Sequence, residues 1–233
     1  MKLEALREAV CHANLELRDR GLALFTWGNA SAIDRERGLI VIKPSGVPYE
    51  QLTPELMTVV GLDGTAVQGS LRPSSDTPTH LALYRAFPMI GGVVHTHSTW
   101  ATVWAQAGFS IPCLGTTHAD VFHGPVPCTR YLSREEIRGE YEAETGRVIV
   151  EAFDGASPEE MPAALVAGHG PFAWGADAWD AVYNAAVLEQ TALMAWATRQ
   201  LRPDCEEIDA ELLHKHYFRK HGPGAYYGNT SSK

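Results

Sequence analysis

Residues 90–97 read Ile90-Gly91-Gly92-Val93-Val94-His95-Thr96-His97 and form the apolar stretch from which the fold can be inferred. Their apolar and β-branched side chains predict a buried strand, and residues 99–107 predict a helix directly after it. Side chains two residues apart on a strand project from the same face, so His95 and His97 should lie side by side. Two neutral imidazoles are half of a zinc or similar transition-metal site, although a structural or solvent-exposed pair has the same spacing.

The rest of the chain predicts strands and helices that interleave without a strict βαβ rhythm. Strands are expected over residues 24–33, 39–42 and 164–166, with a hairpin over 58–67 that turns at Asp63-Gly64. Helices are expected over residues 1–21, 77–87, 133–146, 178–199 and 206–221, the third opening with a capping box at Ser133. These elements predict an α/β class with a mixed or antiparallel sheet.

The composition is that of a folded protein. The chain has 233 residues, of which 45% are hydrophobic and 20% charged, so disorder is excluded as its main character. We expect one domain over residues 1–233. Lys and Arg total 19 against 28 Asp and Glu, a net charge of −9, which argues against general nucleic-acid binding. An anionic small molecule would therefore need a local pocket rather than a global field.

Neither a membrane span nor a signal peptide is expected. No stretch approaches the roughly 20 apolar residues of a span, and charged residues interrupt the apolar positions of residues 1–21. The four cysteines (Cys11, Cys113, Cys128 and Cys205) form no CxxC pair, which predicts reduced thiols in a cytoplasmic protein and argues against a zinc–cysteine cluster.

Two further motifs carry candidate metal ligands. His169 follows a predicted strand in Ala167-Gly168-His169-Gly170-Pro171, where flanking glycines allow close backbone approach; an ordinary turn residue is the alternative. Asp76 lies in Pro73-Ser74-Ser75-Asp76-Thr77-Pro78, at a predicted helix N-terminus. Such a terminus favours these residues for capping, but it also allows serines to face an anion while Asp76 faces a cation.

Two motifs at the ends of the first predicted hairpin could supply donors for a phosphate. They read Thr26-Trp27-Gly28-Asn29-Ala30-Ser31 and Lys43-Pro44-Ser45-Gly46, and each offers a glycine and short polar side chains. Ordinary turn chemistry explains either motif alone. Together with Ser74 and Ser75 they would form the local anion pocket that an acidic protein requires.

Asp120 and Tyr227 are candidate proton-transfer groups. Asp120 ends a polar loop, Thr116-Thr117-His118-Ala119-Asp120, and Tyr227 lies near the C-terminus. A loop aspartate commonly caps a helix and a terminal tyrosine commonly packs. Either could transfer a proton if the fold brought it beside a metal.

These motifs, taken in order, resemble those of the class II aldolase/adducin-head family. The motifs over residues 115–120, 139–142, 169–175 and 215–222 resemble the L-ribulose-5-phosphate 4-epimerases within that family. The resemblance runs from the first predicted helix to the Tyr226-Tyr227 pair. It implies an α/β fold whose central, mainly antiparallel sheet is flanked by helices, assembled as a cyclic homotetramer with active sites at subunit interfaces.

The resemblance also implies a set of site residues. It implies one zinc ion per subunit, held by Asp76, His95, His97 and His169. It implies that substrate is bound by Gly28, Asn29, Lys43, Ser45, Gly46, Ser74 and Ser75. It further implies that Asp120 and Tyr227 form the proton-transfer pair, with the tyrosine reaching in from the adjacent subunit and His216 and Arg219 near the same interface.

The implied activity is the zinc-dependent interconversion of L-ribulose 5-phosphate and D-xylulose 5-phosphate. The C4 hydrogen is not adjacent to the carbonyl, so inversion proceeds by retro-aldol cleavage of C3–C4, rotation of the aldehyde and re-addition, with zinc as the Lewis acid. One alternative is an aldolase of the fuculose- or rhamnulose-phosphate type, which usually carries glutamate where Asp76 stands. Another is a non-catalytic adducin-head-like module. A generic zinc hydrolase is disfavoured by the absence of an HExxH motif.

Overall fold

A seven-stranded antiparallel sheet, in the order β4-β3-β2-β1-β5-β7-β6, lies at the centre of the protein. The structure is a computed structural model that describes residues 3–227. The strands are β1 (Asn29–Asp34), β2 (Leu39–Ile42), β3 (Thr58–Gly61), β4 (Ala66–Gln68), β5 (Gly92–His95), β6 (Ala163–Val166) and β7 (Gly170–Gly175). The predicted α/β class with an antiparallel sheet is confirmed.

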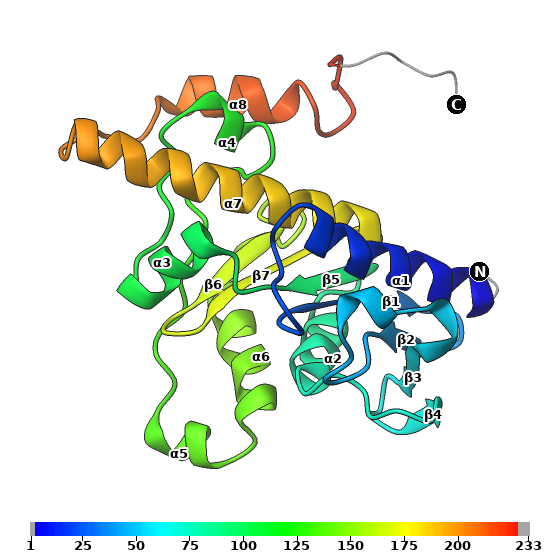
Figure 1. The fold of residues 1–233 in the computed structure, drawn as a ribbon. Helices are drawn as coiled ribbons and strands as arrows, with labels where there is room; N and C mark the ends of the chain where they lie inside the picture. The colour runs from blue at the N-terminus through cyan, green and yellow to red at the C-terminus, as the bar shows by residue number, and fades with distance from the viewer. Residues whose placement is uncertain (1–2, 228–233) are drawn as a thin grey trace.

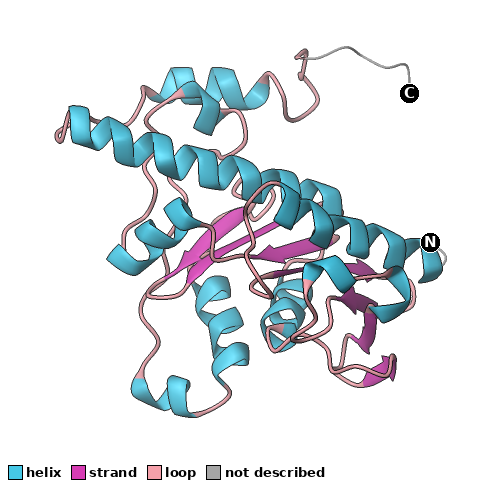
Figure 2. Ribbon diagram, in the orientation of Figure 1, coloured by secondary structure: helices cyan, strands magenta, loops and turns pink. Residues whose placement is uncertain are grey.

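Helices cover both faces of this sheet (Figures 1 and 2). They are α1 (Leu3–Asp19), α2 (Thr77–Ala86), α3 (Thr99–Ala107), α4 (Thr116–Ala119), α5 (Arg134–Arg138), α6 (Tyr141–Glu151), α7 (Ala178–Leu201) and α8 (Ala210–Phe218), with 3-10 turns η1 (Tyr49–Gln51) and η2 (Pro54–Leu56). Figure 1 shows α1 and α7 on one side of the sheet, α2 and α6 on the other, and α4 with α8 beyond α7. Among residues 3–227, no helix is long and apolar enough to cross a membrane. All four cysteines are free thiols.

The central strand β5 is buried between its neighbours and α7. Val93 and Val94 are no more than 1% exposed, and α7 turns small or aliphatic residues such as Ala181 and Leu188 toward the core. Burying a valine or leucine side chain fully contributes about 1.5–3 kcal/mol, so this packing fixes the strand firmly. The end of β5, which carries His95, is therefore a rigid position.

Several elements differ from the sequence-based predictions, among them β5, which covers residues 92–95 rather than 90–97, and the polar loop before Asp120, which forms α4. The first strand begins at Asn29 rather than at residue 24, because Phe25 and Gly28 both take positive φ and turn the chain. The capping box at Ser133 is confirmed, but the helix it starts ends at Arg138, and α6 begins anew at Tyr141. Helix α8 begins at Ala210, four residues after the predicted start at residue 206. Strand β7 was not predicted, because its glycines and proline are typical of a turn.

Candidate active site

Three histidines converge at one end of the central strands. His95 ends β5, His97 follows two residues later, and His169 lies in the turn between β6 and β7. Because His95 pairs with Phe172 on β7, that turn is brought against the end of β5. One ring nitrogen from each histidine lies within 4.8 Å of those of the other two. The group could bind a metal ion.

The spacing and protonation of these rings fit a metal. His95 Nε2 lies 3.2 Å from His97 Nε2, and two nitrogens on one tetrahedral zinc with bonds of roughly 2.05 Å would lie about 3.3 Å apart. Burial is the main cause that lowers the pKa of all three, that of His95 most, so the rings are neutral at pH 7. His95 Nδ1 lies 3.0 Å from the Pro171 carbonyl, to which it must donate, leaving Nε2 a lone pair for a ligand.

Asp76 lies in the same cavity but outside the compact three-histidine group. It is the N-cap residue of α2, yet its side chain makes no capping hydrogen bond. Its carboxylate instead accepts a 2.6 Å hydrogen bond from Asn29 Nδ2. The negative charge opposes the lowering of the pKa of His97 and His169, which places it near both rings. The carboxylate therefore faces the histidines rather than the helix backbone.

A cavity of about 330 Å³ joins the histidines to every residue that the sequence assigned to substrate. The segment after β2 and the segment before α2 form one wall, held together by a bridge between Pro44 and Pro73 and by a bond from Ser74 N to Lys43 O. The predicted substrate residues that line the cavity are Gly28, Asn29, Lys43, Ser45, Gly46, Ser74 and Ser75. Residues scattered along the chain therefore meet beside the candidate metal site.

Lys43 is a buried cation without an anionic partner. It is 2% exposed, and burial lowers its pKa to about 8. Its Nζ is 3.5 Å from the carbonyl oxygens of Thr26 and Pro44 and 5.0 Å from the centre of the Tyr49 ring. Within residues 3–227 no carboxylate forms an ion pair with it. A buried ammonium is costly unless paired, so an anion in this cavity would remove that cost.

The loop before β1 passes unusually close to the end of β5. A Cβ on Gly28 would lie 2.7 Å from the His95 carbonyl oxygen, and its φ is +75°, so only glycine fits there. Tyr49 Oη donates to the carbonyls of Trp27 and Gly28 at 2.8 and 3.0 Å, which fixes the loop. Sequence reasoning missed Tyr49, because nothing in the local pattern of η1 indicates a contact with residues more than 20 positions earlier.

Asp120 and Tyr227 belong to a separate cluster of charged groups. Asp120 accepts hydrogen bonds from His216 at 3.0 Å and from Arg219 at 2.8 Å, and pairs with Lys220 at 3.1 Å. The Tyr227 ring lies 4.7 Å from both cationic groups, Arg219 and Lys220. Burial alone would raise the pKa of Asp120, but the hydrogen bonds from its three partners outweigh burial and lower it. Asp120 is therefore ionised at neutral pH.

This cluster lies away from the three histidines of the same chain. Asp120 lines a different cavity, together with Ile90, before β5, and Gly175, at the end of β7. Gly92 pairs with Gly175, whereas His95 pairs with Phe172, so the two cavities open toward opposite ends of these strands. The five residue steps from Ile90 to His95, the last three of them within β5, span about 16 Å when extended. A single chain therefore does not bring the two predicted proton-transfer residues to its own histidines.

Comparisons with known proteins agree with the fold. The family model described as the Class II Aldolase and Adducin N-terminal domain matches residues 8–196. A solved L-fuculose 1-phosphate aldolase has a TM-score of 0.78 and 22% identity, covering 92% of this chain and 95% of that one. YgbL of Klebsiella pneumoniae, a putative aldolase/epimerase/decarboxylase, has a TM-score of 0.73 and 26% identity over 92% and 99% of the two chains. An L-fuculose-1-phosphate aldolase of Thermus thermophilus has a TM-score of 0.69 and 25% identity over 88% and 100%.

Proposed function

Because this chain belongs to the class II aldolase and adducin N-terminal domain family, we propose that it is a zinc-dependent L-ribulose-5-phosphate 4-epimerase. The observation that carries the proposal is the buried Lys43, which has no ion-pair partner among residues 3–227, in the cavity that the three histidines line. That cavity has a cation for a phosphate at one place and a candidate metal site at another. A phosphorylated sugar with adjacent oxygen atoms matches both.

The phosphate would lie against Lys43, with the hydroxyls of Ser45, Ser74 and Ser75 as further donors. Asn29 Nδ2 already donates to Ser74 Oγ and Asp76, while its buried Oδ1 has no partner in the described part of the chain. That oxygen is free to accept from a sugar hydroxyl. The clamp keeps the aldehyde phosphate bound while it rotates and re-adds, which makes the second step effectively unimolecular.

His95, His97 and His169 would hold the metal, with Asp76 as the fourth ligand. The ion would act as a Lewis acid that stabilises negative charge on the substrate oxygens when C3–C4 breaks. The chain's own contribution is to keep the imidazoles neutral through burial and to fix their orientation.

Asp120 and Tyr227 would act across a subunit interface. Both lie in one cluster, remote from their own chain's histidines, so we propose that both, and not the tyrosine alone, enter the site of an adjacent subunit in a homotetramer. Asp120, which is ionised, would accept the proton of the C4 hydroxyl, and the Tyr227 phenol would return it across that carbon.

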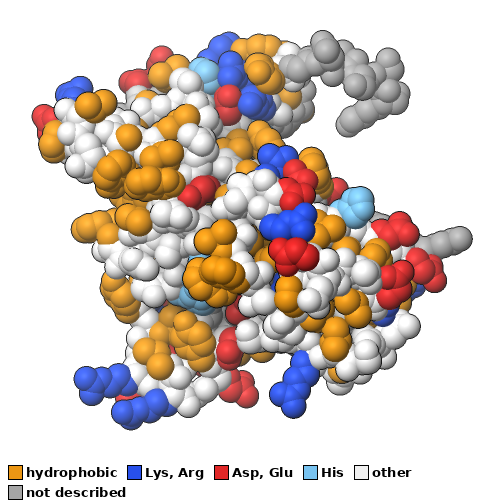
Figure 3. All heavy atoms as spheres, in the orientation of Figure 1, with side chains coloured by type: hydrophobic (Ala, Val, Ile, Leu, Met, Phe, Trp, Pro, Cys, Tyr) orange, Lys and Arg blue, Asp and Glu red, His pale blue; other side chains and the backbone are white. Residues whose placement is uncertain are grey.

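Exposed apolar side chains support this assembly. Figure 3 shows hydrophobic side chains gathered over α3 and the C-terminal half of α7. They include Val103, Met194 and Trp196, each about two-fifths exposed. Apolar surface of this kind is typical of a site of protein association.

We also propose that residues 1–233 form one domain and that the protein is cytoplasmic.

The test is incubation of the purified protein with L-ribulose 5-phosphate. We expect D-xylulose 5-phosphate to form without net release of dihydroxyacetone, and we expect the His97→Ala variant to be inactive. A protein with neither activity nor bound metal would support the non-catalytic adducin-head-like alternative instead.

A second candidate is a class II sugar-phosphate aldolase. The fold similarity to solved L-fuculose-phosphate aldolases favours this candidate. The aldolase of Thermus thermophilus is 25% identical in sequence to this chain. The two activities separate in one experiment, because an aldolase of this type would cleave L-fuculose 1-phosphate or L-rhamnulose 1-phosphate and accumulate dihydroxyacetone phosphate, whereas the epimerase would release no such product.

A further inference from the structure

One segment of the chain contacts each residue of the turn that carries His169. Ala167 N donates to Thr129 Oγ1 at 3.1 Å. The Tyr131 ring lies against Gly168, where an added Cβ would be 3.1 Å from Cε1. Tyr141 Oη lies 3.3 Å from His169 Nδ1. Residues 129–141, the segment that contains α5, therefore contact the backbone, the glycine and the imidazole of this turn.

We infer that Tyr141 is the residue that positions His169 for metal binding, an inference that rests on the proposed function. An imidazole that binds a metal through one nitrogen carries hydrogen on the other and normally donates it to a nearby oxygen. For His169, Nδ1–H would donate to Tyr141 Oη, just as Nδ1–H of His95 donates to the Pro171 carbonyl. This fixes the tautomer and the ring plane, and turns the other nitrogen of His169 toward its two partners.

Tyr141 can do this because its own place is fixed. It is the first residue of α6, after the break at Gly139, so its position depends on how α6 is anchored. The hydroxyl of Thr79 on α2 donates to the Glu142 carbonyl at 2.6 Å. Since α2 starts directly after Asp76, the same contact fixes Tyr141 relative to the carboxylate in the cavity.

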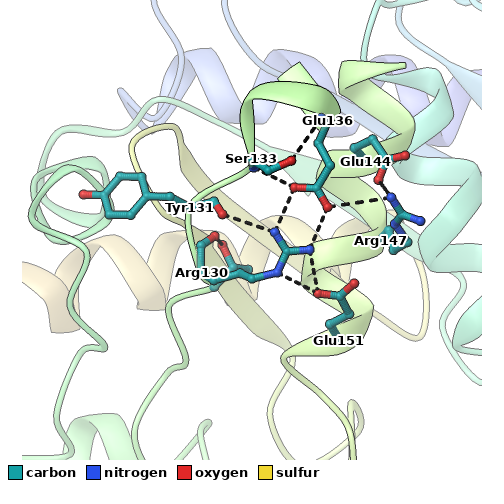
Figure 4. A network of polar contacts seen from close by, with 8 residues as sticks. Arg130, Tyr131, Ser133, Glu136, Glu144, Arg147 and Glu151 are labelled. Carbon is teal, nitrogen blue, oxygen red and sulfur yellow. Dashed lines mark hydrogen bonds and ion pairs between the residues drawn. The ribbon is translucent and has the colours of Figure 1, made fainter. Parts of the chain in front are cut away.

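A network of ion pairs anchors the rest of the segment (Figure 4). Arg130 forms a bidentate pair with Glu136 on α5, at 2.7 and 2.8 Å, and a third bond of 3.0 Å with Glu151 on α6. Arg147 pairs with Glu136 and with Glu144. Because these contacts join α5 to the middle and to the C-terminal end of α6, they fix the geometry of the break between the two helices, with Tyr141 at its edge.

The experiment compares zinc affinity in the wild type and in Tyr141→Phe, which keeps the ring and removes only Oη. We expect the variant to bind zinc 10- to 100-fold more weakly in competition with a chelator, the usual effect of losing such a partner. The cobalt-substituted variant should also show altered visible absorption, because the ligand field changes. Tyr183→Phe, which removes the same hydroxyl from α7 in the cavity of Asp120 rather than in that of the histidines, should match the wild type in both measurements.

The outcomes separate this inference from the proposed function. A wild-type protein that binds neither zinc nor cobalt contradicts the proposed function, and the inference with it. A wild type that binds zinc, with equal affinity and an unchanged cobalt spectrum in Tyr141→Phe, overturns the inference alone. If Tyr141→Phe unfolds more easily, a control of comparable stability decides: Val10→Ala removes buried side-chain volume from α1 and leaves α6 and the phenol intact. Zinc affinity lost equally in Val10→Ala overturns the inference, and affinity retained there supports it.

Discussion

Lys43→Met should make the phosphate-free protein more stable and at the same time prevent phosphate binding. The pKa of Lys43 is lowered from 10.5 to about 8. This lowering of the pKa is worth about 3 kcal/mol against the charged form in the folded state. Methionine has a similar length and no charge, so it escapes this cost. It forgoes the two 3.5 Å contacts and the contact with the Tyr49 ring, worth about 1 kcal/mol together. The expected gain at pH 7 is about 2 kcal/mol.

The pH dependence of stability provides a second test of whether the charge on Lys43 destabilises the folded protein. The folded pKa of Lys43 is lower than the unfolded pKa, so the unfolded state binds more protons between about pH 8 and 10.5. Below pH 8 the wild type therefore bears the whole cost of burying the charged Lys43. Between pH 8 and 10.5 its free energy of unfolding should rise relative to that of Lys43→Met. Above pH 10.5, the advantage of the variant should disappear.

The assay is urea unfolding of both proteins at one protein concentration, at pH 7 and at pH 10, with and without inorganic phosphate. Phosphate should stabilise the wild type by mass action and leave Lys43→Met unaffected. Lys215→Met, which removes an exposed lysine, should respond to phosphate as the wild type does. The reasoning is refuted if Lys43→Met is the less stable protein at pH 7, or if phosphate stabilises both proteins equally.

Three further predictions concern the site. Asp120→Asn and Tyr227→Phe should each lower turnover about 10²-fold. A mixture of Asp120→Asn and His97→Ala subunits should regain activity, because one interface then joins an intact Asp120 to an intact histidine group; a mixture that stays inactive argues against a shared site. Because burial lowers the pKa of His95, His97 and His169, protons compete weakly for these nitrogens, and zinc content after dialysis at pH 6 should match that at pH 7.5. Loss of zinc with a midpoint at pH 6.5 or above would contradict this. Gly28→Ala should destabilise the protein by about 2 kcal/mol or more in urea unfolding, since its Cβ would meet the His95 carbonyl. Gly46→Ala, at φ +69° but with no atom within 4 Å of its Cβ, should cost about 1 kcal/mol, and equal losses would show that the close approach is not what requires glycine.

The sequence by itself determined the elements whose signal is local. The β-branched run before His95, the capping box at Ser133 and the Asp63-Gly64 hairpin each depend on side chains a few residues apart, and all three appear in the structure. The antiparallel sheet and the candidate ligand types followed from the same periodicity and from motif resemblance. The breaks did not, because Phe25 delays the start of β1 and Gly139 follows the end of α5 through backbone geometry that the hydrophobic pattern does not encode.

Only the tertiary structure decided which distant groups meet. His169 reaches His95 because β7 pairs with β5, and no local pattern specifies that partner. Lys43 is buried without a carboxylate only because two loops close over it, and Tyr141 meets His169 only because α6 packs on α2. Conversely, Asp120 lies at the other end of these strands, although its motif resembles that of a residue acting beside the metal. Such contacts join residues tens of positions apart, and their free energy comes from burial and pairing across the whole fold rather than from the order of neighbouring side chains.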